Sequence, residues 1–234
     1  GTGEANYLAM ARALDRGAGD EALLMDPVYP YYPGKTHLLG GVPTLVPTAR
    51  DGSLDVDAVR EAASDDTALI VLNTPNNPTG AVYDLDAVRE VVGIAESVDA
   101  VVVVDEVYDR FDLSGSFESA LALDSDRVIV TSGFSKSMAI TGFRVGFGVF
   151  PEAHVGAAKT RHMLVNVTGA RPSQYAVHHA LAETHPSYYA ESRDLLADRV
   201  DAFTDALDAA GAEYSRPEGA FYVLARFEGF PGTM

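Results

Sequence analysis

The sequence predicts a three-layer α/β fold, in which a mostly parallel sheet lies between two layers of helices. Short apolar segments of strand length alternate with segments of helical pattern along most of the chain. The most apolar segment, 100–104, is rich in valine on both faces, which is typical of a strand covered by helices on both sides. The chain has 234 residues, 47% of them hydrophobic, and can therefore bury a sizeable core.

The expected elements follow in chain order. The strands are short apolar runs, and they cover 22–25, 44–46, 68–72, 100–104, 128–131, 143–150 and 220–227. The helices carry apolar residues at helical spacing, and they cover 4–14, 55–63, 84–97 and most of 152–210. Asp55 and Asp84 are the expected N-caps of the second and third helices, and Gly17 is the expected stop of the first.

A long acidic helix over 187–210 divides the expected domains. We expect a large domain over 1–190, and a linking helix with the start of a smaller domain over 191–234. The apolar residues of this helix at helical spacing are expected to face inward; they are Leu195, Leu196, Val200, Phe203 and Leu207. The chain begins at Gly1 without an initiator methionine and stops at Met234 soon after a strand, so we expect a fragment that lacks both ends of a longer protein.

Composition excludes several classes of partner and site. The 34 acidic residues against 17 basic ones give a net charge of −17, which repels the phosphates of nucleic acids. No apolar run reaches the ~18–20 residues that cross a bilayer. The absence of cysteine excludes disulfides and thiolate sites, and the six histidines show no metal-binding spacing. The carboxylate excess favours a cytoplasmic protein from a high-salt organism; an ordinary acidic enzyme is the alternative.

Three polar loops follow expected strands, where parallel sheets bind their ligands. The first, 73–80, reads Asn-Thr-Pro-Asn-Asn-Pro-Thr-Gly, and the second, 105–108, reads Asp-Glu-Val-Tyr. The third, 132–136, reads Ser-Gly-Phe-Ser-Lys, and Arg144 follows its lysine by eight residues. Lys136 is one of only three lysines in the chain, so a role beyond surface solubility is expected for it.

In this order and spacing, the loops resemble those of the class I/II aminotransferases, which are fold-type I pyridoxal-phosphate enzymes of the aspartate aminotransferase superfamily. The resemblance covers nearly the whole chain. It implies a pyridoxal 5'-phosphate cofactor bound by the large domain, and a homodimer with active sites near the interface. It also implies a ping-pong transfer of an amino group between an L-amino acid and a 2-oxo acid.

The resemblance implies a role for each polar residue of the loops. Lys136 matches the lysine that forms the internal aldimine and, once freed by substrate, moves a proton. Asp105 matches the anion held against the pyridine nitrogen, where it raises the pKa of that nitrogen and strengthens the electron sink. Tyr108 and Asn77 match the donors to the phenolic oxygen of the cofactor. Arg144 matches the arginine that binds the phosphate.

Further matches lie outside the three loops. The first residues resemble the glycine-rich turn that opens a phosphate-binding helix, with Thr2 and Gly3 as candidates; an ordinary helix start explains them equally well. Tyr29 matches the aromatic ring laid over the cofactor, and Tyr32 nearby has no assigned role. Ser132 and Ser135 flank Gly133, which stands where many relatives have a phosphate-binding serine, and both are candidate phosphate contacts. The family's arginine for the substrate α-carboxylate is expected beyond Met234.

Alternatives remain open at this stage. A P-loop ATPase is suggested by 101–106 and by Pro-Gly-Lys-Thr at 33–36, but Tyr29 stands where that loop needs a glycine. Another fold-type I enzyme (a β-lyase, decarboxylase or synthase) and a regulator that binds the cofactor without catalysis would use the same residues. Arg171 is either a surface arginine or a substrate contact, and His178 and His179 are expected at a surface or interface.

Overall fold

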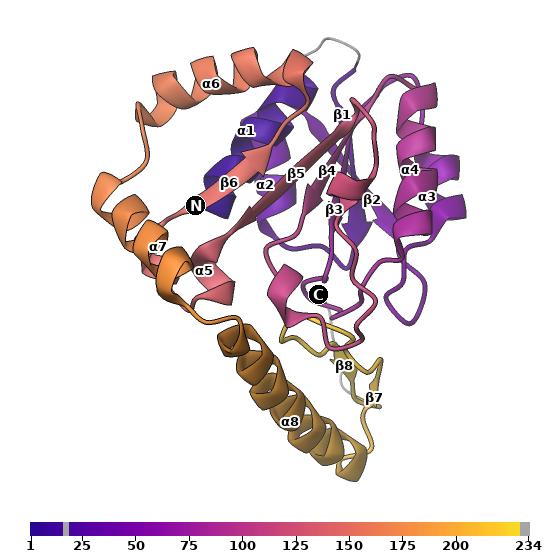
Figure 1. Ribbon diagram of the computed structural model, residues 1–234. Helices are drawn as coiled ribbons and strands as arrows, with labels where there is room; N and C mark the ends of the chain where they lie inside the picture. The colour runs from indigo at the N-terminus through magenta and orange to yellow at the C-terminus, as the bar shows by residue number, and fades with distance from the viewer. Residues whose placement is uncertain (16–18, 230–234) are drawn as a thin grey trace.

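The computed structural model describes residues 1–15 and 19–229. Within these residues, the main sheet has six strands in the order β2-β1-β3-β4-β5-β6 (Figure 1). These strands are β1 (Glu21–Asp26), β2 (Val42–Pro47), β3 (Thr67–Asn73), β4 (Val101–Asp105), β5 (Val128–Gly133) and β6 (Gly146–Val149). The pairs from β2 to β5 are parallel, and β6 runs antiparallel to β5. The mostly parallel sheet predicted from the sequence is confirmed.

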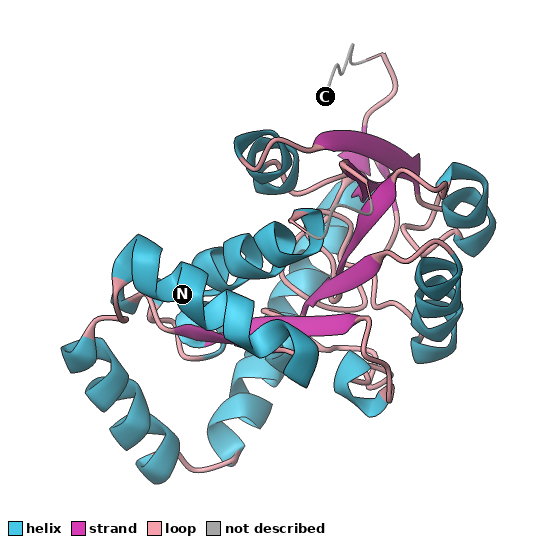
Figure 2. Ribbon diagram, turned by 90° about the horizontal axis from the view of Figure 1, so that it is seen from above, coloured by secondary structure: helices cyan, strands magenta, loops and turns pink. Residues whose placement is uncertain are grey.

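Helices cover both faces of this sheet (Figure 2). The longer ones are α1 (Thr2–Leu14), α2 (Tyr31–Leu38), α3 (Val56–Ala62), α4 (Leu85–Ser97), α6 (Glu152–Asn166), α7 (Arg171–Glu183) and α8 (Ser187–Ala209). The short ones are α5 (Phe134–Ser137), η1 (Asp109–Phe111), η2 (Ala120–Ala122) and η3 (Thr141–Phe143). A separate hairpin pairs β7 (Glu213–Tyr214) with β8 (Ala225–Arg226).

The core has two halves, one on each face of the sheet. Along β3, Leu69 and Val71 pack with residues of α1 and α2, whereas Ile70 and Leu72 pack with residues of α3 and α4. This division follows from the strand geometry, because successive side chains point to opposite faces. Every residue of β3 is buried, which explains why the middle of this strand, Ala-Leu-Ile-Val-Leu, is apolar without alternation.

The expected helix caps are present. The Asp55 side chain accepts a hydrogen bond from the Ala58 amide at 3.0 Å, and Asp84 accepts one from the Asp86 amide at 2.7 Å. Helix α1 begins two residues before the expected start, and the expected stop at Gly17 lies outside the described residues.

Three segments differ from the prediction. The strand expected over 220–227 is wrong over most of its length, because Ala220 has a left-handed backbone (φ 55°) and only Ala225–Arg226 pairs as a strand. The strand expected over 143–150 is shortened to β6, because η3 and the left-handed Arg144 (φ 55°) precede it. Helix α2 was not expected, although Pro33 fits its first turn, where no intrahelical N–H bond is needed.

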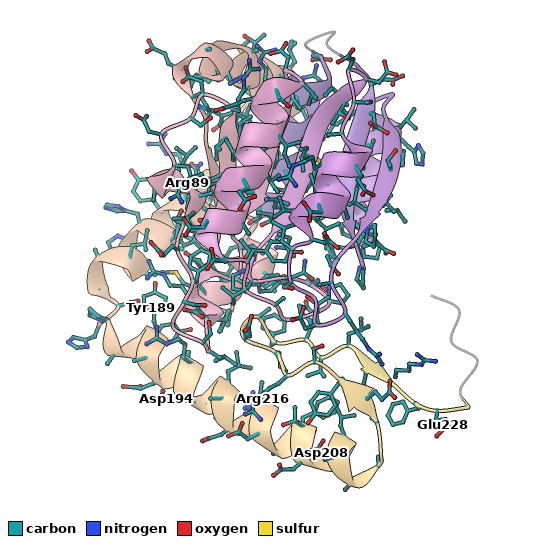
Figure 3. All side chains as sticks on the ribbon, turned by 90° about the vertical axis from the view of Figure 1, so that its right-hand side faces the viewer. Arg89, Tyr189, Asp194, Asp208, Arg216 and Glu228 are labelled. Carbon is teal, nitrogen blue, oxygen red and sulfur yellow. The ribbon has the colours of Figure 1, made fainter. Side chains whose placement is uncertain are left out.

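Helix α8 extends away from the sheet, with the β7–β8 hairpin beside it (Figure 1). Figure 3 shows Asp194 and Asp208 on this helix, far from the sheet. Val200 and Leu207 are buried on this helix, as expected. The prediction that Leu195 and Phe203 also face inward is wrong. Leu195 is 52% exposed and Phe203 is 55% exposed, because the helix packs against few neighbouring segments. The helix is continuous across 190–191, and the division into domains there stays a prediction.

In the described part of the chain, no helix combines the length and the apolar character needed to cross a lipid bilayer.

Candidate functional site

The three polar loops meet at one edge of the sheet. Because β3, β4 and β5 are parallel, their carboxyl ends lie together, and Asn73 pairs in register with Asp105, which pairs with Thr131. The antiparallel β6 starts at the same edge, where Gly146 pairs with Gly133. The topology thus brings the three loops together, although α4 separates the first from the second in the sequence, and η1 and η2 separate the second from the third.

Asp105 ends β4 and is buried, with 4% of its surface exposed. Its Oδ2 accepts hydrogen bonds from Asn6 Nδ2 at 2.6 Å and from the Tyr32 hydroxyl at 2.8 Å, and its Oδ1 accepts one from the Val107 amide at 3.1 Å. Burial raises the pKa of Asp105, whereas these three bonds and the nearby positive charge of Lys35 oppose that rise. The site therefore holds a desolvated carboxyl group whose charge is supported by hydrogen bonds.

The 73–80 loop is tied to the loop after β4. Asn73 Nδ2 donates to the Asp105 carbonyl at 2.9 Å, and Asn73 Oδ1 accepts from the Asn77 amide at 2.8 Å. The Asn77 side chain in turn hydrogen-bonds the Tyr108 hydroxyl. Asn73 therefore holds Asn77 in place against Tyr108.

Lys136 lies next to Tyr108. Its Nζ is 5.9 Å from the centre of the Tyr108 ring and 5.7 Å from the centre of the Phe221 ring. The Tyr108 hydroxyl also hydrogen-bonds the Tyr222 hydroxyl at 3.0 Å. Burial, with the Tyr222 hydroxyl next in size, raises the pKa of Tyr108 far above its usual value. Tyr108 is therefore a neutral hydroxyl that can donate a hydrogen bond beside the Lys136 amine.

A polar cradle, formed by Thr2, Gly133, Ser135, Arg144 and Gly146, lies where α1 begins. The Thr2 hydroxyl is buried and, among the described residues, has no hydrogen-bond partner. A Cβ at Gly133 would collide with this hydroxyl, and one at Gly146 would collide with the Thr2 amide, so glycine is required at both close approaches. Arg144 closes the cradle, with its Nη1 3.4 Å from the Ser135 hydroxyl. A buried unpaired hydroxyl, a helix N-terminus and an arginine suit an anion such as phosphate.

The other phosphate candidates occupy different positions. Gly3 lies exposed in the first turn of α1, directly after Thr2. Ser135 joins the cradle through Arg144, whereas the Ser132 hydroxyl donates to the Glu106 carbonyl at 3.2 Å. The Ser135 hydroxyl thus contacts Arg144, whereas the Ser132 hydroxyl points to the backbone of the loop after β4.

Tyr29 is partly buried, packs against one of the core clusters and contacts the rings of two neighbouring tyrosines. Its ring centre is 4.9 Å from that of Tyr31 and 5.5 Å from that of Tyr32. Burial raises the pKa of the Tyr29 hydroxyl, with smaller contributions from the neighbouring Tyr31, Tyr222 and Asp105. Tyr29 therefore lies close enough to Asp105 for the two groups to interact electrostatically, and its role as the ring over the cofactor stays a prediction.

A strap formed by residues 217–222 closes over these loops. The Glu218 amide donates to the Gly80 carbonyl at 2.9 Å, and Glu218 Oε2 accepts from the Val82 amide at 3.1 Å. The Ala220 amide donates to the Phe111 carbonyl at 2.9 Å. These bonds bring Phe221 and Tyr222 to Lys136 and Tyr108.

Sequence reasoning missed three residues of the site. Asn6 and Tyr32 both donate to Asp105, and Tyr222 contacts Tyr108. A signal for Asn6 existed, because a polar residue stands four positions after Thr2 on the otherwise apolar face of α1. No comparable signal marked Tyr222, since only the tertiary path of the strap brings it to the site.

The structure also shows where the residues with undecided roles lie. Arg171 is exposed and lies over the ring of Tyr175 on its own helix, at 5.5 Å. His178 and His179 are exposed on α7. Residues 33–36 lie inside α2, and the connection between β1 and α2 reads Pro-Val-Tyr-Pro, so the glycine-rich loop of the P-loop alternative is missing.

Comparison with known proteins gives the same family throughout. The sequence profile described as "Aminotransferase class I and II" matches residues 1–229. A probable aspartate/prephenate aminotransferase of Thermus aquaticus is 33% identical over 210 residues, which cover 88% of this chain and 55% of that protein. Its counterpart from Aquifex aeolicus is 32% identical over 240 residues, covering 96% of this chain and 58% of that protein.

Solved structures agree with the sequence comparison. The aspartate aminotransferase from Thermus thermophilus with maleate superimposes with a TM-score of 0.89 at 29% identity, covering 95% of this chain and 59% of that one. The aspartate aminotransferase from Thermotoga maritima superimposes with a TM-score of 0.90 at 28% identity, covering 98% and 60%. The chain thus spans little more than half the length of these relatives.

Proposed function

Because this chain belongs to the family of class I and II aminotransferases, we propose that it binds pyridoxal 5'-phosphate and transfers an amino group between an L-amino acid and a 2-oxo acid. The reaction is of the ping-pong type, with the donor's product leaving before the acceptor enters. The observation that carries this proposal is the convergence of Lys136, Tyr108, Asn77 and Asp105 at one sheet edge, next to a polar cradle that fits a phosphate.

The cradle fits the phosphate of the cofactor. The Thr2 hydroxyl would donate to a phosphate oxygen, which removes the cost of leaving a buried hydroxyl unpaired. The N-terminus of α1, with Gly3 in its first turn, would favour the negative charge. The Arg144 guanidinium would pair with two oxygens, and Ser135 holds this arginine in place.

When bound, pyridoxal 5'-phosphate supplies an electron sink for the pair released at the substrate's α-carbon. Asp105 would hold a proton on the ring nitrogen through its carboxylate, and the bonds from Asn6 and Tyr32 support the charged form that this requires. Tyr29 would cover one face of the ring and limit the access of water.

Lys136 would hold the cofactor through its amine and, when substrate displaces it, would move the proton at the α-carbon. Tyr108 and Asn77 would donate hydrogen bonds to the phenolic oxygen of the cofactor. The hydrogen bond from Asn77 to Tyr108 fixes the relative position of these two donors.

A homodimer and a high-salt origin belong to the same proposal. Several large apolar side chains are exposed on and after α6, as a subunit contact requires: Met163, Leu164, Val165 and Val167. The net charge of −17 is the support for a halophilic protein. Analytical ultracentrifugation of the chain in concentrated KCl tests the dimer, and a monomer at all concentrations contradicts it.

The test of the cofactor site uses borohydride reduction followed by mass spectrometry of peptides. The native chain incubated with pyridoxal 5'-phosphate is expected to carry the reduced adduct on Lys136, and Lys136→Ala is expected to lose it. Lys159→Ala is the matched control, because Lys159 is an exposed lysine on α6. An adduct that persists on another residue in Lys136→Ala refutes the assignment.

The reaction class is tested with amino donors. Aspartate as donor, with prephenate among the acceptors, heads the panel because the relatives are named for these compounds. Conversion of the bound cofactor to the pyridoxamine form supports transamination. Release of ammonia or carbon dioxide indicates a lyase or a decarboxylase, and an unchanged spectrum with every donor indicates a regulator without catalysis.

A further inference from the structure

Asn6 is a buried polar residue on the core-facing side of α1. It is 2% exposed and shares this side with Ala9, Met10 and Ala13. A buried amide is costly unless its donor and acceptor atoms are both paired. Asn6 Nδ2 donates to Asp105 Oδ2 at 2.6 Å, and Asn6 Oδ1 accepts from the Thr131 hydroxyl. Asn6 therefore joins α1 to the ends of both β4 and β5.

The carboxylate of Asp105 dictates the orientation of the Asn6 amide. Thr131 and Asp105 stand opposite each other in the β4–β5 register, so one side chain can reach both. A reversed amide would place Asn6 Oδ1 against the carboxylate oxygen of Asp105, which is repulsive. The Thr131 hydroxyl can donate or accept and so tolerates either orientation, whereas the acceptor-only carboxylate of Asp105 requires the NH₂ group to face it. An apolar residue would fill the same space but would leave Asp105 without one of its donors.

We propose that Asn6 is a positioning residue for Asp105. Helix α1 then contributes to both ends of the cofactor site, through Thr2 at the phosphate end and Asn6 at the Asp105 end. This inference rests on the proposed function, since it assigns Asp105 to the ring nitrogen and Thr2 to the phosphate. Thr2 and Asn6 are four residues apart and therefore lie on one face, separated by about 6 Å of helix rise. One rigid helical turn fixes the spacing between the cradle and the carboxylate.

Other groups also face Asp105, and the test must separate them from Asn6. Tyr32 donates to the same oxygen, and Lys35 brings a positive charge from α2. Asp105 contributes to the raised pKa values of its chain neighbour Glu106 and of Tyr29 and Tyr108, so these groups are coupled to it as well. None of these groups is altered when Asn6 alone is replaced, so a change in the titration of Asp105 reports the Asn6 bond.

The first experiment follows the carboxyl titration of Asp105 by ¹³C NMR in the cofactor-free chain. Loss of a hydrogen bond to a charged group removes support for the ionised form, so Asn6→Leu is expected to raise the pKa of Asp105 by about 1–2 pH units. Asn6→Ala keeps a strong helix former at this position in case leucine does not fit, and must shift the pKa in the same direction. Met10→Leu alters the same face without contacting Asp105 and is the matched control. An unchanged titration in both Asn6 variants overturns the proposal.

A second experiment follows the visible absorption of the chain loaded with pyridoxal 5'-phosphate as the pH is varied. Asn6→Leu is expected to retain the cofactor, because the phosphate cradle is intact, but to shift the pH midpoint of the absorption change. A purely structural role would leave that midpoint unchanged. If the native chain binds no cofactor, the proposed function fails, whereas the NMR titration still decides whether Asn6 acts on Asp105.

Discussion

Glu106 gives a quantitative prediction for the pH dependence of stability. It follows Asp105 and is buried, with 4% of its surface exposed. Its Oε1 accepts from the Ala120 amide and its Oε2 from the Ser119 hydroxyl, both at 2.7 Å. Burial raises the pKa of Glu106 from 4.5 to about 7; the two hydrogen bonds oppose the rise, and the nearby Asp109 adds to it.

The sign follows from proton binding. Between pH 4.5 and about 7, the folded chain holds a proton on Glu106 that the unfolded chain has released. The free energy of unfolding therefore falls as the pH rises through this window, by about 1.4 kcal/mol per pH unit. Over the whole window Glu106 alone accounts for a loss of about 3 kcal/mol.

Glu106→Gln removes this titration while keeping an acceptor for the Ala120 amide and a polar group for Ser119. Urea unfolding of the native and variant chains across this pH range is the assay. The advantage of the variant in free energy of unfolding is expected to grow by about 3 kcal/mol from pH 4.5 to above pH 7. Glu118→Gln, at an exposed glutamate nearby, is the matched control. Parallel pH profiles for the native chain and Glu106→Gln would refute the reasoning.

Four other predictions concern the site and the surface. Asp105→Asn is expected to retain the cofactor but to slow proton transfer by about 10²–10⁴-fold in stopped-flow measurements, and near-native rates contradict the role of the carboxylate. Arg144→Ala is expected to weaken cofactor binding by about 10–100-fold in equilibrium titration while leaving the rate at saturating cofactor largely intact; the reverse pattern contradicts phosphate binding. Tyr222→Phe is expected to lower the pKa of Tyr108, since the Tyr222 hydroxyl helps to raise it, and ultraviolet difference titration against the native chain measures the change. The melting temperature is expected to rise with KCl, and a melting temperature that is flat or falls with salt rejects the halophilic hypothesis.

The central sheet could be predicted because burial on both faces leaves a sequence signal. The segment at 100–104 is apolar without alternation, and the structure places a fully buried strand over Val101–Asp105. The segment at 220–227 is also rich in apolar residues, yet its first residues belong to the strap, where the Ala220 amide donates to the Phe111 carbonyl, and only Ala225–Arg226 pairs as a strand. Composition alone does not distinguish these two outcomes, because the partners of the strap are distant in sequence.

In the site too, residues that belong to a local sequence motif could be predicted, and residues that the tertiary fold brings in from elsewhere could not. Asp105 and Lys136 could be found because each stands in a short motif directly after a strand. Their neighbours come from elsewhere: Asn6 from a helix and Tyr222 from the strap. These residues belong to no local motif, so only the arrangement of strands and helices shows that they reach the site.

The strap also affects the order in which this molecule can fold. Its bonds join residues far apart along the chain, 136 positions for Val82 with Glu218 and 114 for Tyr108 with Tyr222. Contacts of such long range form after the local ones, because closing a large loop costs entropy before any contact compensates for it. On the ribosome, the sheet can assemble while the strap is still unsynthesised, so Lys136 would meet Tyr108 first and Phe221 only after the strap has docked.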